Sequence, residues 1–268
     1  MDTTEIRNTI NRAMSSFWWV PETFGIVDRP EISYCIDPKG DFNYVSRIEA
    51  EDKDLPLLVA EIAERFRDIN YKVFTYSYQS KKLFALLDRA GFQSENEHNI
   101  LFQYIQNHGF RKWPNFLIEK VQSKEQLIAL EKSSAQIFRK RFQLRSDDEY
   151  HHMLKEYHQE KPRAMRFLAR DIASKEVLGS ASMSLFPELK VVTFFGGCTI
   201  PSERKKGVYS ALIDARMEYA KQRGLEIAAV YARKTTSSPI VKKQGFHHCG
   251  EMTYWVRKAN FAQSFRRR

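Results

Sequence analysis

The sequence predicts a mixed α/β protein with two domains. The chain has 268 residues, and a domain usually contains about 100 to 200, so we expect two. In the C-terminal half, strand and helix patterns alternate after antiparallel hairpin patterns, which is typical of a mixed α/β sheet. Trp113-Pro114 follows a polar stretch that contains glycine, and we therefore place the domains at residues 1–112 and 113–268.

Composition and charge limit the classes of function. The chain is 43% hydrophobic and 28% charged, as in folded globular proteins, and its three cysteines are too widely spaced for a disulfide framework. No apolar run approaches the roughly 20 residues that span a membrane, so we expect a cytoplasmic protein with no membrane partner. The net charge of +10 leaves two interpretations open, a solvated basic surface or a partner that carries phosphates.

The N-terminal half has a regular order of elements between residues 43 and 104. Apolar periodicity predicts a strand, a helix, a strand and a helix, at residues 43–48, 55–67, 71–76 and 81–89. Gly91-Phe92 closes the second helix. This order is that of an α/β module.

The C-terminal half begins with a strand and two helices. Residues 116–121 are rich in apolar side chains and predict the strand. Ser123 and Gln126 have the spacing of a capping box, which predicts a helix that continues to about Arg139. Residues 147–157 predict a second, more polar helix.

Strands follow these helices. Residues 166–169 and 177–185 flank a polar turn and predict a hairpin. Residues 191–200 predict a longer strand that contains Gly196-Gly197. A glycine pair inside a strand indicates a bulge or a close backbone approach.

The clearest helix covers residues 208–222, because five apolar residues form one stripe along it. Residues 227–232 are a continuous apolar run, which predicts a strand buried on both faces. Ser238 opens a short helix that Gly245 ends, and residues 246–256 predict the last strand or pair of strands.

The segment PSERKKGVYSAL, residues 201–212, is the most informative for function. A strand pattern runs into a basic turn and then into a helix, whose N-terminal N–H groups and dipole favour an anion. Arg204, Lys205 and Lys206 precede the helix, and Gly207 lets the backbone approach a ligand closely. The segment is either a pyrophosphate-binding loop or a basic surface turn with a glycine, and it matches neither a P-loop nor the dinucleotide fingerprint.

The segment resembles the acetyl-CoA-binding motif of the GNAT superfamily, [R/Q]-x-x-G-x-[G/A] before an amphipathic helix. Arg204 and Gly207 match this motif, and Tyr209 departs from its last position. Residues 237–246 resemble the second motif of the family, a short helix that ends in Gly-Phe. The resemblance covers residues 115–256 and implies a GNAT acyl-CoA acyltransferase fold in the C-terminal domain.

The resemblance implies a function. Acetyl-CoA would be the co-substrate, with no metal, and a primary amine of a small molecule or peptide would attack the thioester directly. The strand at residues 191–200 would splay from its neighbour and expose backbone groups to the pantetheine arm. The cofactor-binding residues implied are Cys198, Thr199, Ile200, Arg204, Lys205, Lys206, Gly207, Val208, Tyr209 and Ser238.

The usual catalytic residues of the family are missing. Many members place Glu on the strand before the loop and Tyr four residues before Gly-Phe, but this strand has no Glu and that position is Val241. Tyr231 and Tyr254 are candidate acids, although either is also explained as a core or rim aromatic. Cys198 is a candidate nucleophile, but the sequence favours a small buried residue. The alternative function is therefore a catalytically weak acyl-CoA-binding or RNA- or protein-docking module.

Two clusters suggest other ligands. Residues 138–145 interleave aromatic and basic side chains, which is typical of an RNA contact, but we favour an amphipathic helix with a solvated basic face. His247-His248 and His151-His152 suggest a metal, yet adjacent strand residues point to opposite faces, so we predict none. An amine acceptor is favoured over nucleic acid as the partner.

The element order of residues 43–104 resembles the second half of the same GNAT fold. We predict a smaller, divergent GNAT-like α/β domain there, in tandem with the first, and an unrelated α/β module is the alternative. Residues 49–54, where the loop belongs, are acidic and lack glycine, so we expect no CoA site. A scaffolding role, or one wall of a substrate cleft, is expected instead.

Overall fold

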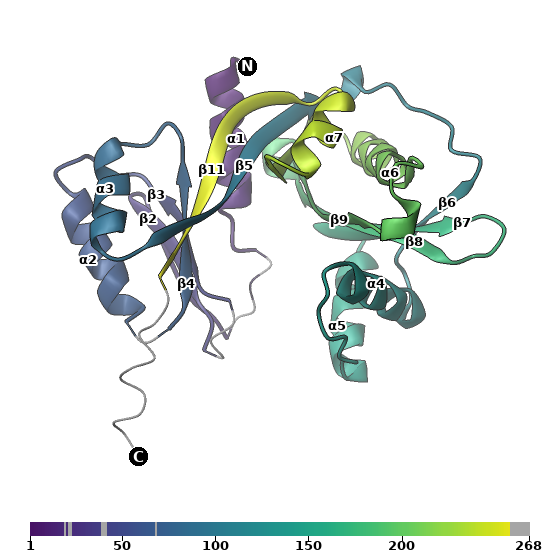
Figure 1. Ribbon diagram of the computed structural model, residues 1–268, viewed down its shortest axis with the longest axis horizontal. Coiled ribbons are helices and arrows are strands. Elements are labelled where there is room, and N and C mark those ends of the chain that lie inside the picture. The colour runs from purple at the N-terminus through teal and green to yellow at the C-terminus, as the bar shows by residue number, and fades with distance from the viewer. Residues whose placement is uncertain (19, 21–22, 39–41, 68, 258–268) are drawn as a thin grey trace. The chain divides into compact units, whose positions relative to one another are not determined.

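The computed structural model describes residues 1–18, 20, 23–38, 42–67 and 69–257. The chain forms two compact units. Unit 1 comprises Met1–Ile100, Ala232–Pro239 and His248–Arg268, and unit 2 comprises Leu101–Tyr231 and Ile240–His247. Each unit combines strands with helices (Figure 1), so the predicted mixed α/β class is confirmed.

The sheet of unit 1 takes strands from distant parts of the chain. Its strand order is β1-β2-β3-β4-β11-β5. The bounds are β1 (Gly25–Arg29), β2 (Ile32–Ile36), β3 (Tyr44–Ile48), β4 (Tyr71–Tyr76), β5 (Gln93–Tyr104) and β11 (His247–Arg257). β1, β2 and β3 pair antiparallel in sequence, β3 and β4 pair parallel, and β4 pairs antiparallel with β11. Strands β3 and β4 were predicted; β1 and β2 were not.

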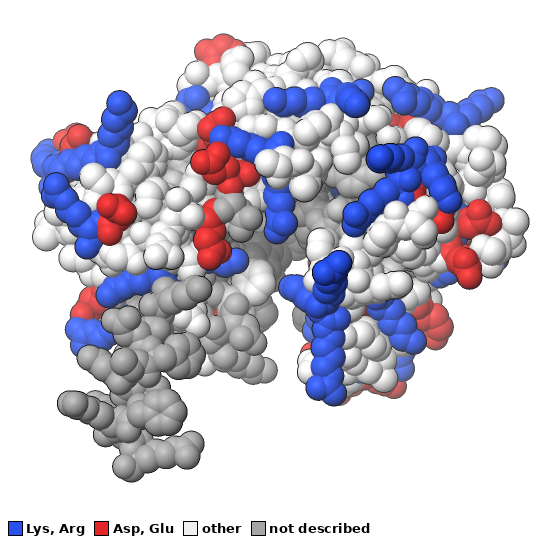
Figure 2. Space-filling model, viewed as in Figure 1, with Lys and Arg blue, Asp and Glu red and all other residues white. Residues whose placement is uncertain are grey.

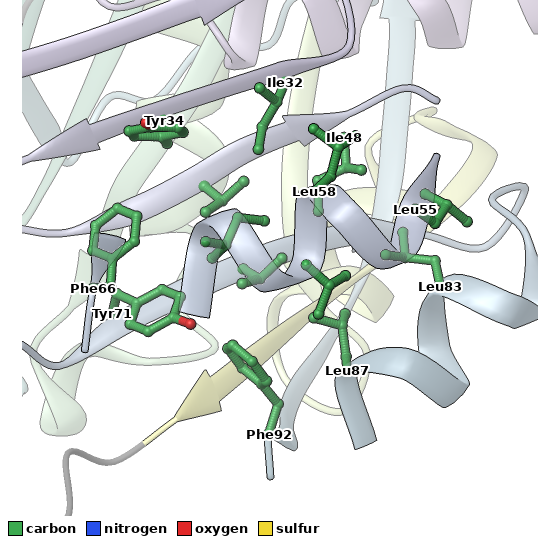
Figure 3. Packing of buried hydrophobic residues seen from close by; sticks show 14 residues of the cluster. Ile32, Tyr34, Ile48, Leu55, Leu58, Phe66, Tyr71, Leu83, Leu87 and Phe92 are labelled. Carbon is green, nitrogen blue, oxygen red and sulfur yellow. The ribbon is translucent and has the colours of Figure 1, made fainter. Parts of the chain in front are cut away.

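The helices of unit 1 are α1 (Thr3–Met14), α2 (Leu55–Arg65) and α3 (Lys81–Arg89). The sequence predicts α2 and α3, whereas α1 is an addition that begins with a capping box of Asp2 and Glu5. Figure 3 shows the core that α2 and α3 build with the strands. In it the Phe66 ring stacks on that of Tyr71 with centroids 4.4 Å apart, and Tyr71 meets the edge of Phe92.

The sheet of unit 2 has the order β10-β9-β8-β7-β6, with the end of β5 next to β10. The bounds are β6 (Phe116–Lys120), β7 (Ala164–Asp171), β8 (Val177–Phe186), β9 (Val191–Thr199) and β10 (Ile227–Arg233). The predicted hairpin is the antiparallel pair β7–β8, and β10 runs parallel to β9. At the end of β5, Ile105 N–H donates to Glu226 O at 2.9 Å.

The helices of unit 2 are α4 (Lys124–Ile137), α5 (Asp147–Tyr157), α6 (Val208–Gln222) and α7 (Ser237–Lys243), which begins in unit 1. Figure 1 shows α4 and α5 on one side of this sheet and α6 on the other. The predicted capping box of α4 is confirmed, because Gln126 N–H donates to Ser123 Oγ and Ser123 N–H donates to Gln126 Oε1. The apolar stripe of α6 is buried as predicted.

The predicted amphipathic helix at residues 138–145 is wrong. Helix α4 ends at Ile137, and Arg139 has a left-handed backbone with φ of 52°. The segment offers no continuous apolar face to the sheet, since most of it is exposed. Arg145 instead folds back onto α4, where its Nε lies 2.7 Å from Glu131 Oε1.

The two units repeat one order of elements. The order β1-β2-β3-α2-β4-α3 in unit 1 corresponds to β7-β8-β9-α6-β10-α7 in unit 2, with the same antiparallel and parallel pairings. The last strands differ in placement: β11 lies next to β4, and β5 lies next to β10. Within the part of the chain that is described, no helix has the length and apolarity to cross a membrane.

Candidate functional site

The basic loop of unit 2, from Arg204 to Gly207, leads into a helix whose N-terminus has no side-chain cap. After β9, a short 3-10 turn at Pro201–Glu203 precedes the loop, and Gly207 stands at the N-cap of α6 with φ of 98°. No side chain caps this end, so its first N–H groups are free of the capping bonds found at α4. Uncapped N–H groups at the positive end of a helix dipole are suited to an anion such as a pyrophosphate.

The cations of the loop differ in their partners. Lys206 Nζ lies 3.1 Å from Glu203 Oε1, whereas Arg204 and Lys205 are exposed and have no ion pair within the described residues. Figure 2 shows Lys and Arg side chains gathered over the face of unit 2 that carries α6 and α7. The loop therefore keeps positive charge available for an anionic ligand.

Strand β9 has a free edge just before the loop. The parallel pairs between β9 and β10 begin at Val191–Ile227 and end at Phe194–Val230, and Phe195 is 45% exposed. Ile200 N–H donates to Leu178 O on the β8 side of the strand. Backbone groups of successive strand residues point to opposite sides, so the N–H and C=O of the residue before Ile200 point toward the free edge.

That preceding residue is Thr199. Its hydroxyl Oγ1 is buried and has no hydrogen-bond partner among the described residues. A buried orphan hydroxyl beside free backbone groups fits a polar ligand such as the amide-rich pantetheine arm. Cys198 and Ile200 flank Thr199, so the three residues predicted on this strand are contiguous with the loop.

The glycine pair of β9 forms the predicted bulge. The register with β8 shifts by one residue between Ser180 and Ser182, and Gly196 has φ of 60°. A Cβ on Gly197 would lie 2.7 Å from Cε2 of Tyr209. The bulky residue at the last motif position is therefore accommodated because its ring occupies the space of the missing Gly197 side chain.

Gly207 is required for a reason that the sequence did not reveal. A Cβ at this position would lie 2.5 Å from Cζ3 of Trp113, and the positive φ already disfavours any other residue. The sequence predicted that the backbone at Gly207 approaches a ligand closely, and the group found close to it is the indole ring of Trp113 in the same unit. Trp113 in turn packs near Phe116, with ring centroids 6.1 Å apart.

Asp214 on α6 holds the segment that carries this indole. Trp113 Nε1–H donates to Asp214 Oδ2 at 2.8 Å, and the backbone N–H of Arg111 donates to the same oxygen at 3.3 Å. His108 Nε2 lies 2.7 Å from Asp214 Oδ1, and His108 Nδ1 lies 3.2 Å from Gln103 Oε1. The His108 and Asp214 side chains are only 2% and 7% exposed, so this network is a buried anchor behind the loop.

Three residues of this region, Trp113, Asp214 and Arg216, were not predicted as site residues from the sequence. A signal for Arg216 was available, since it lies four residues after Leu212 and shares the face of the apolar stripe. A charged residue on a stripe face needs buried partners. For Trp113 no local pattern identifies its partner.

Cys198 has the surroundings of a small buried residue. It is 6% exposed, and its Sγ lies 3.2 Å from Ser180 Oγ, which is 3.3 Å from Ser134 Oγ. Among the described residues, the hydrogen-bond partner of the thiol is the Ser180 hydroxyl, whereas a nucleophilic cysteine has a cation or base beside it. Cys35 and Cys249 are also buried and free, and burial raises the pKa of each of these two thiols to about 11.

The remaining predicted site residues fall in different places. Tyr231 lies on β10 in unit 2. Tyr254 belongs to unit 1, where it packs against Phe74 and His98 and where burial raises its pKa. Ser238, at the start of α7, is 1% exposed, and its Oγ accepts a hydrogen bond from Asn99 Nδ2 at 2.7 Å.

Unit 1 has an acidic segment where unit 2 has its loop. Between β3 and α2 the chain carries Glu49, Glu51 and Asp54, and α2 also lacks a side-chain cap. Lys53 pairs with Glu51 at 2.8 Å and leaves a net negative segment. Like charge disfavours a phosphate here, so the described geometry places the candidate anion site in unit 2.

Known proteins are similar to this chain. Residues 128–250 match the acetyltransferase (GNAT) family. A GCN5-related N-acetyltransferase from Kribbella flavida has a TM-score of 0.69 at 12% identity, over 96% of this chain and 97% of that one. One from Sphaerobacter thermophilus has a TM-score of 0.62 at 12% identity, over 87% and 82% of the two chains.

A tandem GNAT protein from the clavulanic acid biosynthesis pathway is similar across both units. Its TM-score is 0.61 at 11% identity, and the similarity covers 97% of each chain. No curated protein matches the sequence. Likeness at such identities concerns the fold, and it extends the GNAT-like architecture to unit 1 as well as unit 2.

Proposed function

Because residues 128–250 of this chain form a domain of the acetyltransferase (GNAT) family, we propose that the protein is an acetyl-CoA-dependent N-acetyltransferase of the cytoplasm. The acceptor is a primary amine of a small molecule or peptide. The amine attacks the thioester carbonyl directly, with no metal in the reaction. Unit 2 carries the co-substrate site, and unit 1 serves as a scaffold.

The observation that carries this proposal is the continuous path from the uncapped end of α6 to the free edge of β9. The N–H groups from Arg204 to Tyr209 bind the pyrophosphate, assisted by the cations of the loop. The backbone and orphan hydroxyl of Thr199 bind the pantetheine arm. Both groups belong to unit 2.

Calorimetric titration of acetyl-CoA into the wild type tests the proposal first. We expect binding in the micromolar range. The variant Arg204→Ser/Lys205→Ser should bind about tenfold more weakly, because each exposed ion pair contributes about 0.5–1 kcal/mol. The two side chains are exposed, so their removal should leave the fold intact.

A matched control removes the same charge elsewhere. Lys155 is exposed in α5, and Lys161 is exposed in the turn after it, where Glu160 O accepts a hydrogen bond from Arg223 at the end of α6 opposite the loop. The variant Lys155→Ser/Lys161→Ser should bind acetyl-CoA like the wild type. Equal weakening by both double variants would mean that only the net charge matters and would count against a site at the loop.

Gly207→Glu tests pyrophosphate binding less selectively than the double variant does. Its carboxylate would repel the pyrophosphate, but its Cβ would also collide with Trp113 and the backbone would be strained. Loss of binding in this variant therefore needs a thermal unfolding curve beside it. If the wild type fails to bind saturating acetyl-CoA, the enzyme proposal falls and a docking module takes its place.

A further inference from the structure

Arg216 is a buried cation without an acidic partner. It is 1% exposed, its Nε donates to Leu212 O at 2.9 Å, and its Nη1 donates to Ser182 O at 3.2 Å. Its Nη2 is buried and has no hydrogen-bond partner, and no carboxylate forms an ion pair with it within the described residues. Burial lowers the pKa of Arg216 to about 10. An unpaired buried charge is costly, so a partner that acquires negative charge would stabilise it.

The neighbour of this guanidinium that can acquire negative charge is Tyr209. Tyr209 and Arg216 both lie on α6, and both reach the bulge of β9. Arg216 Nη1 donates to Ser182 O, and Ser182 pairs with Phe195 beside the bulge. The Oη of Tyr209 would be 3.3 Å from a Cβ on Gly197, and this phenol partly offsets the burial that lowers the pKa of Arg216. A cation beside a phenol stabilises the phenolate.

The bulge lies on the path of the co-substrate. From the loop, an arm bound along the free edge of β9 passes Thr199 first and reaches Gly197 two residues later. Strand residues are about 3.3 Å apart, so the step is about 7 Å. An extended arm that starts at the pyrophosphate site therefore brings its sulfur end to the bulge, where Tyr209 stands.

We propose that Tyr209 is the acid that protonates the departing sulfur, and that Arg216 is the positioning residue that stabilises the resulting phenolate. This inference rests on the proposed acetyltransferase function. As the amine nitrogen bonds to the carbonyl carbon, the C–S bond breaks and its electron pair leaves on sulfur. The Tyr209 hydroxyl gives its proton to that sulfur. The proton lost by the amine passes to solvent, and solvent reprotonates Tyr209.

The thiol of free CoA is a probe that needs no acceptor. A donor placed to protonate the sulfur also stabilises the thiolate of bound CoA, and so lowers the pKa of this thiol below its value in free CoA. We would follow the ultraviolet absorption of the thiolate against pH for CoA bound to the wild type and to Tyr209→Phe. Protein saturated with S-methyl-CoA, which has no thiol, supplies the baseline.

We expect the pKa of the bound thiol to be about one unit higher in Tyr209→Phe than in the wild type. The phenyl ring keeps the packing against Gly197, so the variant should still bind CoA. Arg216→Met should raise the pKa of the bound thiol in the same direction. If Arg216→Met does not fold, as judged by circular dichroism, the comparison of wild type with Tyr209→Phe decides alone.

Tyr219→Phe is the matched control. Tyr219 also lies on α6, and its buried hydroxyl has no hydrogen-bond partner among the described residues, but its ring packs against Phe167 on β7, away from the bulge. This variant should leave the pKa of the bound thiol unchanged. Equal values in the wild type and Tyr209→Phe, with CoA bound to both, would overturn the role of Tyr209 and leave the proposed function intact. Failure of the wild type to bind CoA would overturn both.

Discussion

Asp214 shows how one residue links the start of unit 2 to its candidate anion site. A carboxylate at 7% exposure is stable only with donors around it, and Trp113, Arg111 and His108 supply them. Because the Trp113 ring covers Gly207, these bonds also fix what the loop packs against. The carboxylate is thus a structural anchor for the basic loop.

Replacing this carboxylate should destabilise the protein. We expect Asp214→Ala to lower the free energy of unfolding by about 3 kcal/mol or more, because His108 and Trp113 would keep buried donors without acceptors. Denaturant unfolding measures the change. Glu218→Ala removes an exposed carboxylate one turn later on the same helix and should change the free energy by less than about 0.5 kcal/mol.

A similar loss in both variants would mean that helix propensity or net charge is responsible. The network around Asp214 would then contribute nothing specific. A loss limited to Asp214→Ala, accompanied by weaker acetyl-CoA binding, would support the link between the anchor and the loop.

At the scale of elements, β9 and α6 are adapted to each other. The bulge bends β9 at Gly196, and the adjacent Gly197 leaves room for the ring of Tyr209 from the first turn of α6. The glycine pair and the bulky motif residue are therefore one packing arrangement. When the two segments are considered separately, the glycine pair departs from a strand pattern and Tyr209 departs from the loop motif.

We expect Gly197→Ala to cost about 1–3 kcal/mol of stability, because the new Cβ would overlap the Tyr209 ring. Most of this loss should disappear when Tyr209→Leu is combined with it. A double-mutant cycle from denaturant unfolding measures the coupling. Additive losses would show that strand conformation, rather than contact with Tyr209, limits this position.

Gly109→Ala serves as the control for this cycle. Gly109 is in the same unit, and a Cβ there would meet no atom within 4 Å. Its substitution should change the free energy of unfolding by less than about 0.5 kcal/mol, and it should not couple to Tyr209→Leu.

At the scale of the whole molecule, each unit depends on residues that the predicted domains assign elsewhere. The predicted boundary at Trp113 separates His108 and Gln103 from Asp214, although all three lie in unit 2. The boundary remains a prediction about independent folding. The hydrogen bonds to Asp214 give a physical reason to expect a more stable C-terminal domain when it begins before Trp113.

Two fragments compare these boundaries. A fragment of residues 101–268 keeps every donor to Asp214, whereas a fragment of residues 113–268 loses Arg111 and His108. We expect the longer fragment to unfold at a higher denaturant concentration. Equal denaturant midpoints for the two fragments would support the boundary at Trp113. They would also mean that solvent replaces the hydrogen bonds of Arg111 and His108 to Asp214 without loss of stability.

The sequence by itself determined most of unit 2 and the position of its loop. Periodicity located α6, the capping box at Ser123 located α4, and the glycine pair indicated the bulge. These features succeed because each depends on residues a few positions apart, within one turn of helix or one step of a strand. The helix prediction for residues 138–145 failed because an amphipathic helix needs a surface to pack its apolar face against, and most of this segment is exposed.

Only the tertiary structure decided which distant partners meet. Strands β5 and β11 follow equivalent helices, yet β11 joins β4 and β5 joins β10, and no pattern within either strand distinguishes these choices. In the same way, Asp214 meets His108 from 106 residues away and Tyr209 meets Gly197 across two elements. Such pairings depend on complementary shape and on the burial of charge in the assembled core, which arise only when the elements have come together.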